Sequence, residues 1–358
     1  MNGSSLQTVS PLDGRYAASI QDLRPYFSEF ALIKTRLHVE IIYLLLLSKQ
    51  KKILSLSTKE KDFLKKIDAN FSEKEAEEVK KIEKKTHHDI KAIEYYLAEK
   101  CRKTHPNIIP YIHFALTSED INSITYSLLI KKARDIILLP TLQELIRVIC
   151  TVAEKEKATT MLARTHGQPA VPTSLGKEFM VYAMRLYKTY QRVREEPIEA
   201  KLTGAVGAFN AHLVAYPDID WMKFSCDFVR SLDLKPNIFT TQILPPDSYV
   251  HLFQSIELIN SILIGFSQDI WRYISDDYFV LHSDKDEVGS STMPQKVNPI
   301  DFENSEGNLG MANSLLGFFS EKLPISRLQR DLSDSTVKRI LDQLSDIRYL
   351  DINRLSED

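Results

Sequence analysis

The sequence predicts an all-α protein built as a bundle of long helices. Three observations favour this class. Apolar residues recur at helical spacing over long segments, a capping pattern precedes a charged helical segment, and no persuasive alternation of apolar and polar residues marks a β-strand. Helices of such length are stabilised mainly by packing against one another, so we expect an extended bundle and an oligomer.

The predicted helices follow one another along the chain. Ser72 has capping-box spacing to Glu75 and leads into a segment rich in Glu and Lys. The longest helix is expected from Ser118 to about Lys157. Pro140 should kink this helix rather than end it, because the apolar periodicity resumes after it. Further helices are predicted over residues 174–200, 249–281 and 301–319.

Two prolines, Pro106 and Pro110, interrupt the helical pattern and predict a domain boundary. We therefore expect a smaller helical N-terminal domain at residues 1–110 and a central long-helix bundle at residues 111–340. Residues 341–358 match no pattern that we can place, so we expect a C-terminal domain to be short or absent.

Composition excludes several classes of protein. With 358 residues, 43% hydrophobic and 26% charged, the chain has the make-up of a soluble globular protein. A net charge of −2 argues against a general nucleic-acid binder. Three widely spaced cysteines are typical of free thiols in a reducing compartment. Neither a secretory signal nor an apolar run of membrane-spanning length is expected, and we predict a cytoplasmic protein without membrane contact.

The most informative segment is the loop Gly289–Pro299. Glycine and serine give the loop freedom to open and close over a site. Met293 and Asn298 each precede a proline, which restricts their backbone to non-helical conformations at the end of the loop. Taken alone, a segment of this composition is typical of a surface linker. The whole string, however, resembles the signature GSSxMPxKxNP of the fumarase/aspartase superfamily.

Further motifs in family order extend this resemblance to most of the chain. Within the superfamily they are similar to the adenylosuccinate lyase family of the bacterial type. The motifs are Ser10–Tyr16, Thr86–Ala92, His113–Asn122, Arg164–Pro169, Gly204–Gly207, Thr240–Gln242, Asp301–Asn308 and Arg327–Arg339. The resemblance implies a β-elimination that releases fumarate from a succinyl-amine, without a cofactor.

The resemblance also implies the proton-transfer residues. Ser291 matches the family's base, which needs Lys296 and backbone N–H groups to stabilise its alkoxide. His166 lies among turn-forming residues and matches the acid that protonates the departing nitrogen. Glu303 matches the carboxylate that orients this histidine, although a glutamate early in a helix is also favoured by the helix dipole.

His88 matches a family histidine that binds substrate and assists proton transfer. Its neighbour His87 stands where we expect asparagine. Adjacent histidines raise the alternative of a metal site, but adjacent helix positions diverge by about 100° and no third ligand is near in sequence. We therefore expect no metal.

The remaining candidates bind substrate. Thr117 and Ser118 stand at a predicted helix start, where N–H groups and hydroxyls suit a carboxylate and also suit simple capping. Arginine forks suit a phosphate. By resemblance the other substrate-binding residues are Arg15, Tyr16, Asp89, Gln242, Asn298, Arg330, Ser335 and Arg339.

Two alternatives stay open at this point. The first is an argininosuccinate lyase-like enzyme, which Gln295 in the loop motif slightly favours. The second is a helical oligomeric scaffold without catalysis. If the resemblance holds, the long helix separates Thr117 from His166 by about 60 Å. No single chain then holds a complete site, and we expect a homo-oligomer, a tetramer by resemblance, whose subunits share active sites around a small nucleotide substrate.

Overall fold

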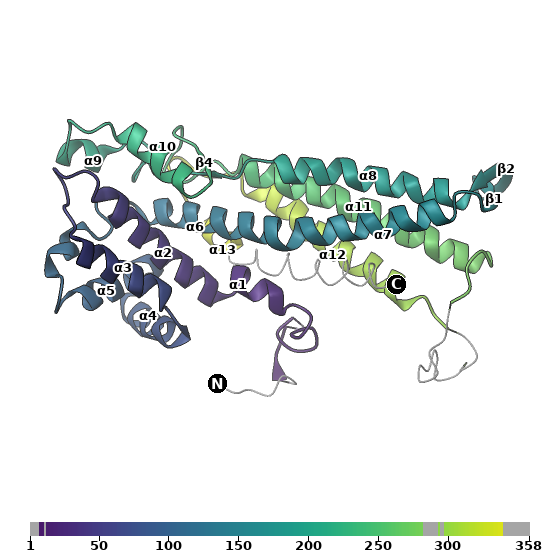
Figure 1. Cartoon of the computed structure of the whole chain (residues 1–358), viewed down its shortest axis with the longest axis horizontal. Helices are drawn as coiled ribbons and strands as arrows, with labels where there is room; N and C mark the ends of the chain where they lie inside the picture. The colour runs from purple at the N-terminus through teal and green to yellow at the C-terminus, as the bar shows by residue number, and fades with distance from the viewer. Residues whose placement is uncertain (1–6, 11, 282–292, 294–296, 339–358) are drawn as a thin grey trace.

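The computed structural model describes residues 7–10, 12–281, 293 and 297–338. Of the residues that the structure describes, 65% are helical and few lie in strands, which confirms the predicted all-α class. Figure 1 shows an elongated molecule in which long helices run side by side and shorter helices gather near one end.

The first part of the chain forms the group of shorter helices. Ser72 and Glu75 form the predicted capping box at the start of α4. The 3₁₀ helix η3 occupies the place of the predicted domain boundary. The elements are η2 (Gln21–Leu23), α1 (Arg24–Phe27), α2 (Glu29–Leu47), α3 (Thr58–Ala69), α4 (Glu73–Thr86), α5 (Asp89–Cys101) and η3 (Pro106–Tyr111).

The predicted long helix is continuous over Ser118–Lys155, as 38 residues. It comprises α6 (Ser118–Ala133), a π-helical turn (Arg134–Leu138) and α7 (Leu139–Lys155). In that turn the Leu139 N–H bonds the Arg134 carbonyl, five residues back. The irregular turn directly precedes Pro140, whose ring has no N–H to donate and crowds the preceding turn. The proline therefore distorts the helix without ending it, as predicted.

Three more long helices complete the bundle: α8 (Leu175–Glu195), α11 (Asp247–Ser275) and α12 (Ile300–Lys322). The predicted helix over 174–200 ends early because Glu196 precedes a proline and has extended backbone. The predicted helix over 249–281 also ends early, at Ser275, and Asp277 then adopts a left-handed conformation. The predicted helix over 301–319 is confirmed and is slightly longer.

The expectation of no strands is wrong in one place of consequence. β1 (Thr160–Thr165) and β2 (Gln168–Ser174) pair antiparallel, with Thr165 opposite Gln168. The hairpin turn is His166-Gly167, with φ of 55° and 73°. Two positive φ values in a two-residue loop match the twist of a hairpin, and Gly167 tolerates this conformation readily. The short remaining elements are β3 (Glu199–Ala200), α9 (Asn210–Ala215), α10 (Trp221–Ser231), β4 (Lys235–Pro236) and α13 (Ser333–Lys338).

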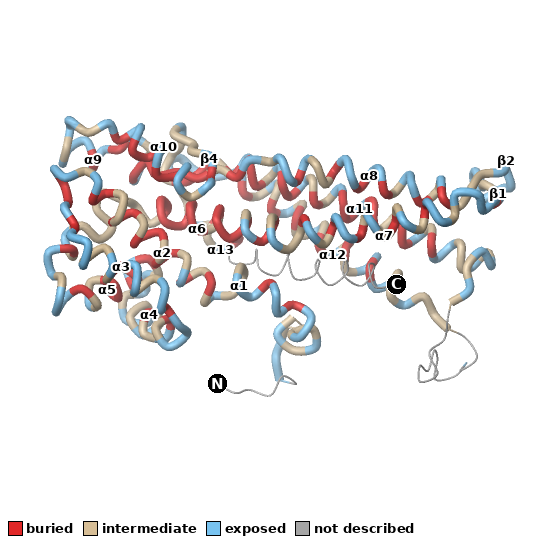
Figure 2. Tube along the Cα trace, in the orientation of Figure 1, coloured by how far each residue is buried: buried red, intermediate tan, exposed pale blue. Residues whose placement is uncertain are grey.

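The core of the bundle lies between its long helices. α11 buries one face that includes Leu252, Ile259 and Leu263, and α12 meets the core with Leu309 and Phe319. Figure 2 shows the buried residues on the inward sides of these helices, whereas the β1–β2 hairpin is mostly exposed.

Two helices, Ser118–Lys155 and Asp247–Ser275, are long and apolar enough to cross a membrane by length and composition. This qualifies our expectation that no segment of that kind exists. Core helices of a bundle pass the same test, so the finding is weak evidence for a membrane.

Candidate active site

The proposed carboxylate-binding residues stand at the start of α6. Thr117 is the N-cap in extended backbone, and Ser118 is the first helical residue. The Asp120 carboxylate accepts a hydrogen bond from the Thr117 N–H at 2.9 Å. Both hydroxyl residues are half-buried. The site therefore offers hydroxyls at the positive end of a helix, an arrangement that favours an anion.

A fully buried lysine fixes this helix start. The Lys201 ammonium lies 3.1 Å from an Asp120 oxygen and donates to the carbonyls of Gly204 and Gln242 at 3.0 and 2.6 Å. An ammonium has three donors, so all three are used. Asp120 also accepts from the N–H groups of Thr203 and Gly204. Segments far apart in the sequence therefore meet at this ion pair.

Gln242 belongs to the same cluster. It is half-buried, and its carbonyl accepts a hydrogen bond from Lys201. Its N–H donates to the Gln329 carbonyl at 3.2 Å, which ties this loop to the segment that precedes Arg330. The structure therefore brings the backbone of Gln242 close to the start of α6, where Thr117 and Ser118 lie.

His88 caps the start of α5. Its Nδ1 accepts a hydrogen bond from the Lys91 N–H at 3.3 Å, and its ring is exposed. When Nδ1 accepts, the proton of the neutral ring sits on Nε2, which then points a donor away from the helix. His87 ends α4 with φ 53°, a left-handed position that suits asparagine and that histidine also tolerates.

Arg330 and Ser335 form a second group of polar side chains. An Arg330 terminal nitrogen donates to Ser335 Oγ at 2.8 Å and lies 3.1 Å from a Glu119 oxygen. Within the described residues, the buried Arg330 Nε has no hydrogen-bond partner. The guanidinium is therefore held in place by Ser335 and Glu119.

The proposed acid lies at the other end of the molecule. His166 is exposed at the tip of the β1–β2 hairpin, beyond the end of α7 (Figure 1). The hairpin is held against the end of α11, where Arg164 lies 3.5 Å from Asp276. Glu303 is also exposed and accepts from the Trp271 indole N–H at 3.1 Å, a different partner from the expected His166.

The structure does not place every predicted residue. Ser291, Lys296 and Arg339 lie outside the described residues. Asn298 is half-buried just before α12. Arg15 is exposed and Tyr16 half-buried in the turns before α1. In the described ranges, no group of three or more His, Cys, Asp or Glu side chains is placed to hold a metal ion.

Sequence reasoning assigned no role to Lys201, Asp120, Glu119 or Arg36. The last of these is buried in α2 and pairs with Asp89 at 2.8 Å. A signal was available, because a charged residue within an apolar stretch of a core segment needs a partner. The identity of the partner depends on contacts between segments far apart in the sequence.

Comparison with known proteins gives a consistent result. A family model described as lyase matches residues 14–313. The chain is 48% identical over 346 residues to adenylosuccinate lyase of Legionella pneumophila (strain Corby), covering 95% of this chain and 76% of that relative. It is 46% identical over 347 residues to adenylosuccinate lyase of Escherichia coli (strain K12), with the same coverage.

Among solved structures, 3-carboxy-cis,cis-muconate lactonizing enzyme from Pseudomonas putida has the same fold. Its TM-score is 0.77 at 18% identity, over 94% of this chain and 73% of that one. The fold and the sequence similarity agree, and the chain belongs to the adenylosuccinate lyase family.

Proposed function

We propose that this chain cleaves adenylosuccinate to fumarate and AMP, and that it also releases fumarate from the succinylcarboxamide ribotide of purine biosynthesis. The main support is 48% identity to an adenylosuccinate lyase across 95% of the chain. The reaction is a β-elimination that breaks a carbon–nitrogen bond and forms the double bond of fumarate.

Each step of the reaction needs one group of the proposed site. Ser291, as an alkoxide stabilised by Lys296, removes the proton from the carbon beside a carboxylate. The electron pair is held as an aci-carboxylate while Thr117 and Ser118 bind the succinyl carboxylate. His166, oriented by Glu303, then protonates the departing nitrogen as the bond breaks.

The nucleotide is bound by a second set of residues. Arg330 and Ser335 are proposed to hold the phosphate, and the hydrogen bond between them supports a shared role. His88 contacts the substrate through Nε2 and assists proton transfer. The other proposed contacts are Arg15, Tyr16, Asp89, Gln242, Asn298 and Arg339.

The complete site is proposed to form between subunits. At 1.5 Å per residue, the 38 residues of Ser118–Lys155 span about 57 Å. Thr117 precedes this helix and His166 follows it, whereas catalysis requires both within a few ångströms of one small substrate. Antiparallel packing of copies in a symmetric homotetramer brings one subunit's Thr117 to another's His166.

The proposal also covers the cellular location, the pathway and the domain organisation of the enzyme. We infer a cytoplasmic enzyme of purine and AMP biosynthesis that binds neither nucleic acid nor membrane. We also keep the division into an N-terminal domain at residues 1–110 and a central bundle at residues 111–340; residues 341–358 lie outside the described part of the chain.

The test is a direct assay of fumarate release by the purified protein, with adenylosuccinate and argininosuccinate side by side. We expect turnover of adenylosuccinate and none of argininosuccinate. Turnover of argininosuccinate alone would assign the other lyase activity, and the absence of both activities in a folded oligomer would favour a scaffold.

A further inference from the structure

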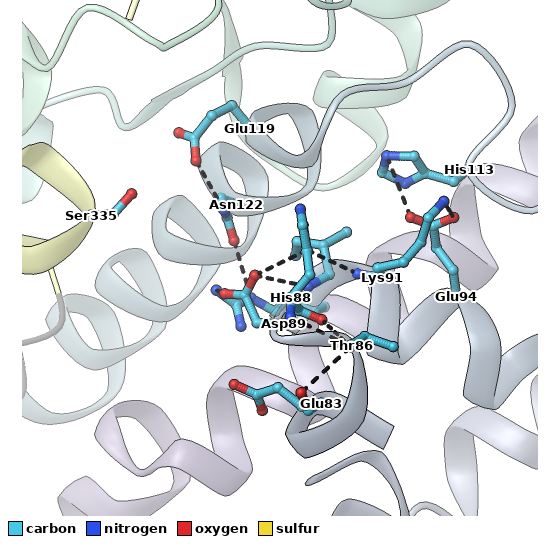
Figure 3. A network of polar contacts seen from close by, with 12 residues as sticks. Glu83, Thr86, His88, Asp89, Lys91, Glu94, His113, Glu119, Asn122 and Ser335 are labelled. Atoms are coloured by element: carbon cyan, nitrogen blue, oxygen red, sulfur yellow. Dashed lines mark hydrogen bonds and ion pairs between the residues drawn. The ribbon is translucent and has the colours of Figure 1, made fainter. Parts of the chain in front are cut away.

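A continuous chain of polar contacts joins the two nucleotide-binding groups within one subunit. One group is His88 and Asp89 at the start of α5, and the other is Arg330 and Ser335. Figure 3 shows Asn122 lying between Glu119 and Asp89, in the space that separates Ser335 from His88.

Arg36 of α2 forms the first link of this chain. Its side chain is almost fully buried. One terminal nitrogen lies 2.8 Å from Asp89 Oδ2, and its Nε donates to Asn122 Oδ1 at 3.0 Å. The other Asp89 oxygen accepts from the Ile90 N–H at 2.8 Å. A planar guanidinium that uses two of its nitrogens fixes the directions of both partners, which a lysine cannot do.

Asn122 of α6 forms the second link. Its Oδ1 accepts from Arg36, and its Nδ2 donates to Glu119 Oε1 at 2.8 Å. A flipped amide would set a donor against the guanidinium and an acceptor against the carboxylate, so its orientation is determined. Glu119 is buried and lies 3.1 Å from Arg330, which donates to Ser335.

The charges along this chain alternate in sign, from Asp89 to Arg36, then through Asn122 to Glu119 and Arg330. Buried ionic contacts add little net stability compared with well-packed apolar side chains. They do fix geometry, because each member has one arrangement that satisfies its neighbours. This series of polar contacts joins α2, α5, α6 and the segment after α12, which come from distant parts of the sequence.

We propose that Arg36 and Asn122 are positioning residues that set the placement of His88 and Asp89 relative to Arg330 and Ser335. This inference rests on the proposed function, which puts both groups on one nucleotide. In this proposal, each of the two acts by fixing a residue that contacts the substrate.

The test measures kcat, KM and AMP inhibition for Arg36→Lys and Asn122→Leu. We expect kcat/KM to fall by about 10–10²-fold in each variant, the usual cost of a small misplacement in an active site. Asn122→Leu should also weaken AMP inhibition, because Glu119 loses the amide that orients it and so holds Arg330 less firmly.

A mutant cycle separates positioning from stability. Arg36→Lys is combined with Asp89→Asn, and we expect it to cost far less in that background, because the carboxylate that Arg36 orients is gone. Arg134→Lys is the control. Arg134 is as buried as Arg36 but donates to the Val193 carbonyl, away from both groups. This control substitution should lower Tm and leave kcat/KM unchanged.

Two outcomes overturn the proposal. One is an unchanged kcat/KM in Arg36→Lys and Asn122→Leu; the other is the same fold-loss for Arg36→Lys with and without Asp89→Asn. If Arg36→Lys does not fold, Asn122→Leu and its AMP inhibition decide the question. A wild-type protein that releases no fumarate from adenylosuccinate contradicts the proposed function itself, which is a separate result.

Discussion

The two ends of the long helix are built in different ways. At the Thr117 end, a buried ion pair between Lys201 and Asp120 holds several segments of the same chain together. At the other end, His166 is exposed on a two-residue turn, and the nearby Arg164 lies 3.5 Å from Asp276 at the end of α11. The Thr117 end is therefore fixed by buried contacts within the chain, whereas His166 is exposed at the other end.

Substitutions at the two ends should therefore have different effects on stability and on activity. A change at the buried end disturbs contacts that hold the fold, so it should alter both stability and activity. A change at the exposed turn removes few contacts within the subunit, so it should alter activity alone. The contrast is also what a site shared between antiparallel subunits requires.

The largest effect is expected at the exposed end. His166→Ala should fold normally and lose about 10²–10⁴ in kcat, the usual contribution of a proton-transfer group. Ser291→Ala should lose a similar factor for the same reason. Steady-state kinetics and thermal unfolding of both variants check this expectation. Near-normal turnover in Ser291→Ala would remove the serine from the role of base and leave His88 as the next candidate.

The second prediction tests whether the two ends meet between subunits. An inactive variant at Thr117 and Ser118 is mixed with His166→Ala, and the mixture is dissociated and reassociated. Partial activity should return, because some mixed sites receive an intact Thr117 end from one chain and an intact His166 from another. Mixtures assayed without dissociation are the control. Full inactivity of properly mixed oligomers would contradict a shared site.

The third prediction concerns the buried ion pair. Lys201→Met nearly keeps the length of the side chain but leaves the Asp120 charge buried without its ammonium, which should cost about 3–5 kcal/mol of unfolding free energy. Adding Asp120→Asn should restore part of that loss, since no buried charge is then left unpaired. Denaturant unfolding measures both. A loss below about 1 kcal/mol in Lys201→Met would show that this cluster does not hold the helix start.

The sequence predicted the long helices well because their apolar residues keep the 3.6-residue period over many turns. It missed the β1–β2 hairpin, where Pro169 and Pro172 interrupt any alternation and the turn at His166-Gly167 reverses the chain. Nor did it predict the early ends of α8 and α11, which depend on single residues just beyond the last turn.

In the candidate site, too, some residues could be predicted from the sequence and others could not. Motifs located Thr117, Ser118 and Gln242, which the structure brings together. They gave no information on Lys201 or Arg36, because the partners of a buried charge come from distant segments. Ser291, Lys296 and Arg339 lie outside the described residues, so their places in the site stay predictions.

The smallest effect is expected from His212, at the buried end. Its ring is fully buried beside Phe209 and Trp221, and within the described residues neither ring nitrogen has a hydrogen-bond partner. Burial lowers the pKa of His212 from 6.5 to about 4, although the Asp120 charge opposes this shift.

The sign of the pH effect follows from that lowered pKa. In the unfolded chain the ring binds a proton below about pH 6.5, whereas in the folded protein it stays neutral down to about pH 4. The stability due to the neutral ring is therefore fully present above pH 6.5 and is lost as the pH falls toward 4.

His212→Phe removes this titration, so its Tm should fall less than that of the wild type between about pH 7 and about pH 5. His87→Asn, a change at an exposed histidine, is the control and should keep the wild-type slope. An equal slope in His212→Phe would mean that the buried ring takes up its proton in the folded state as readily as in the unfolded chain. The contrast between the two ends would then be weaker than the burial suggests.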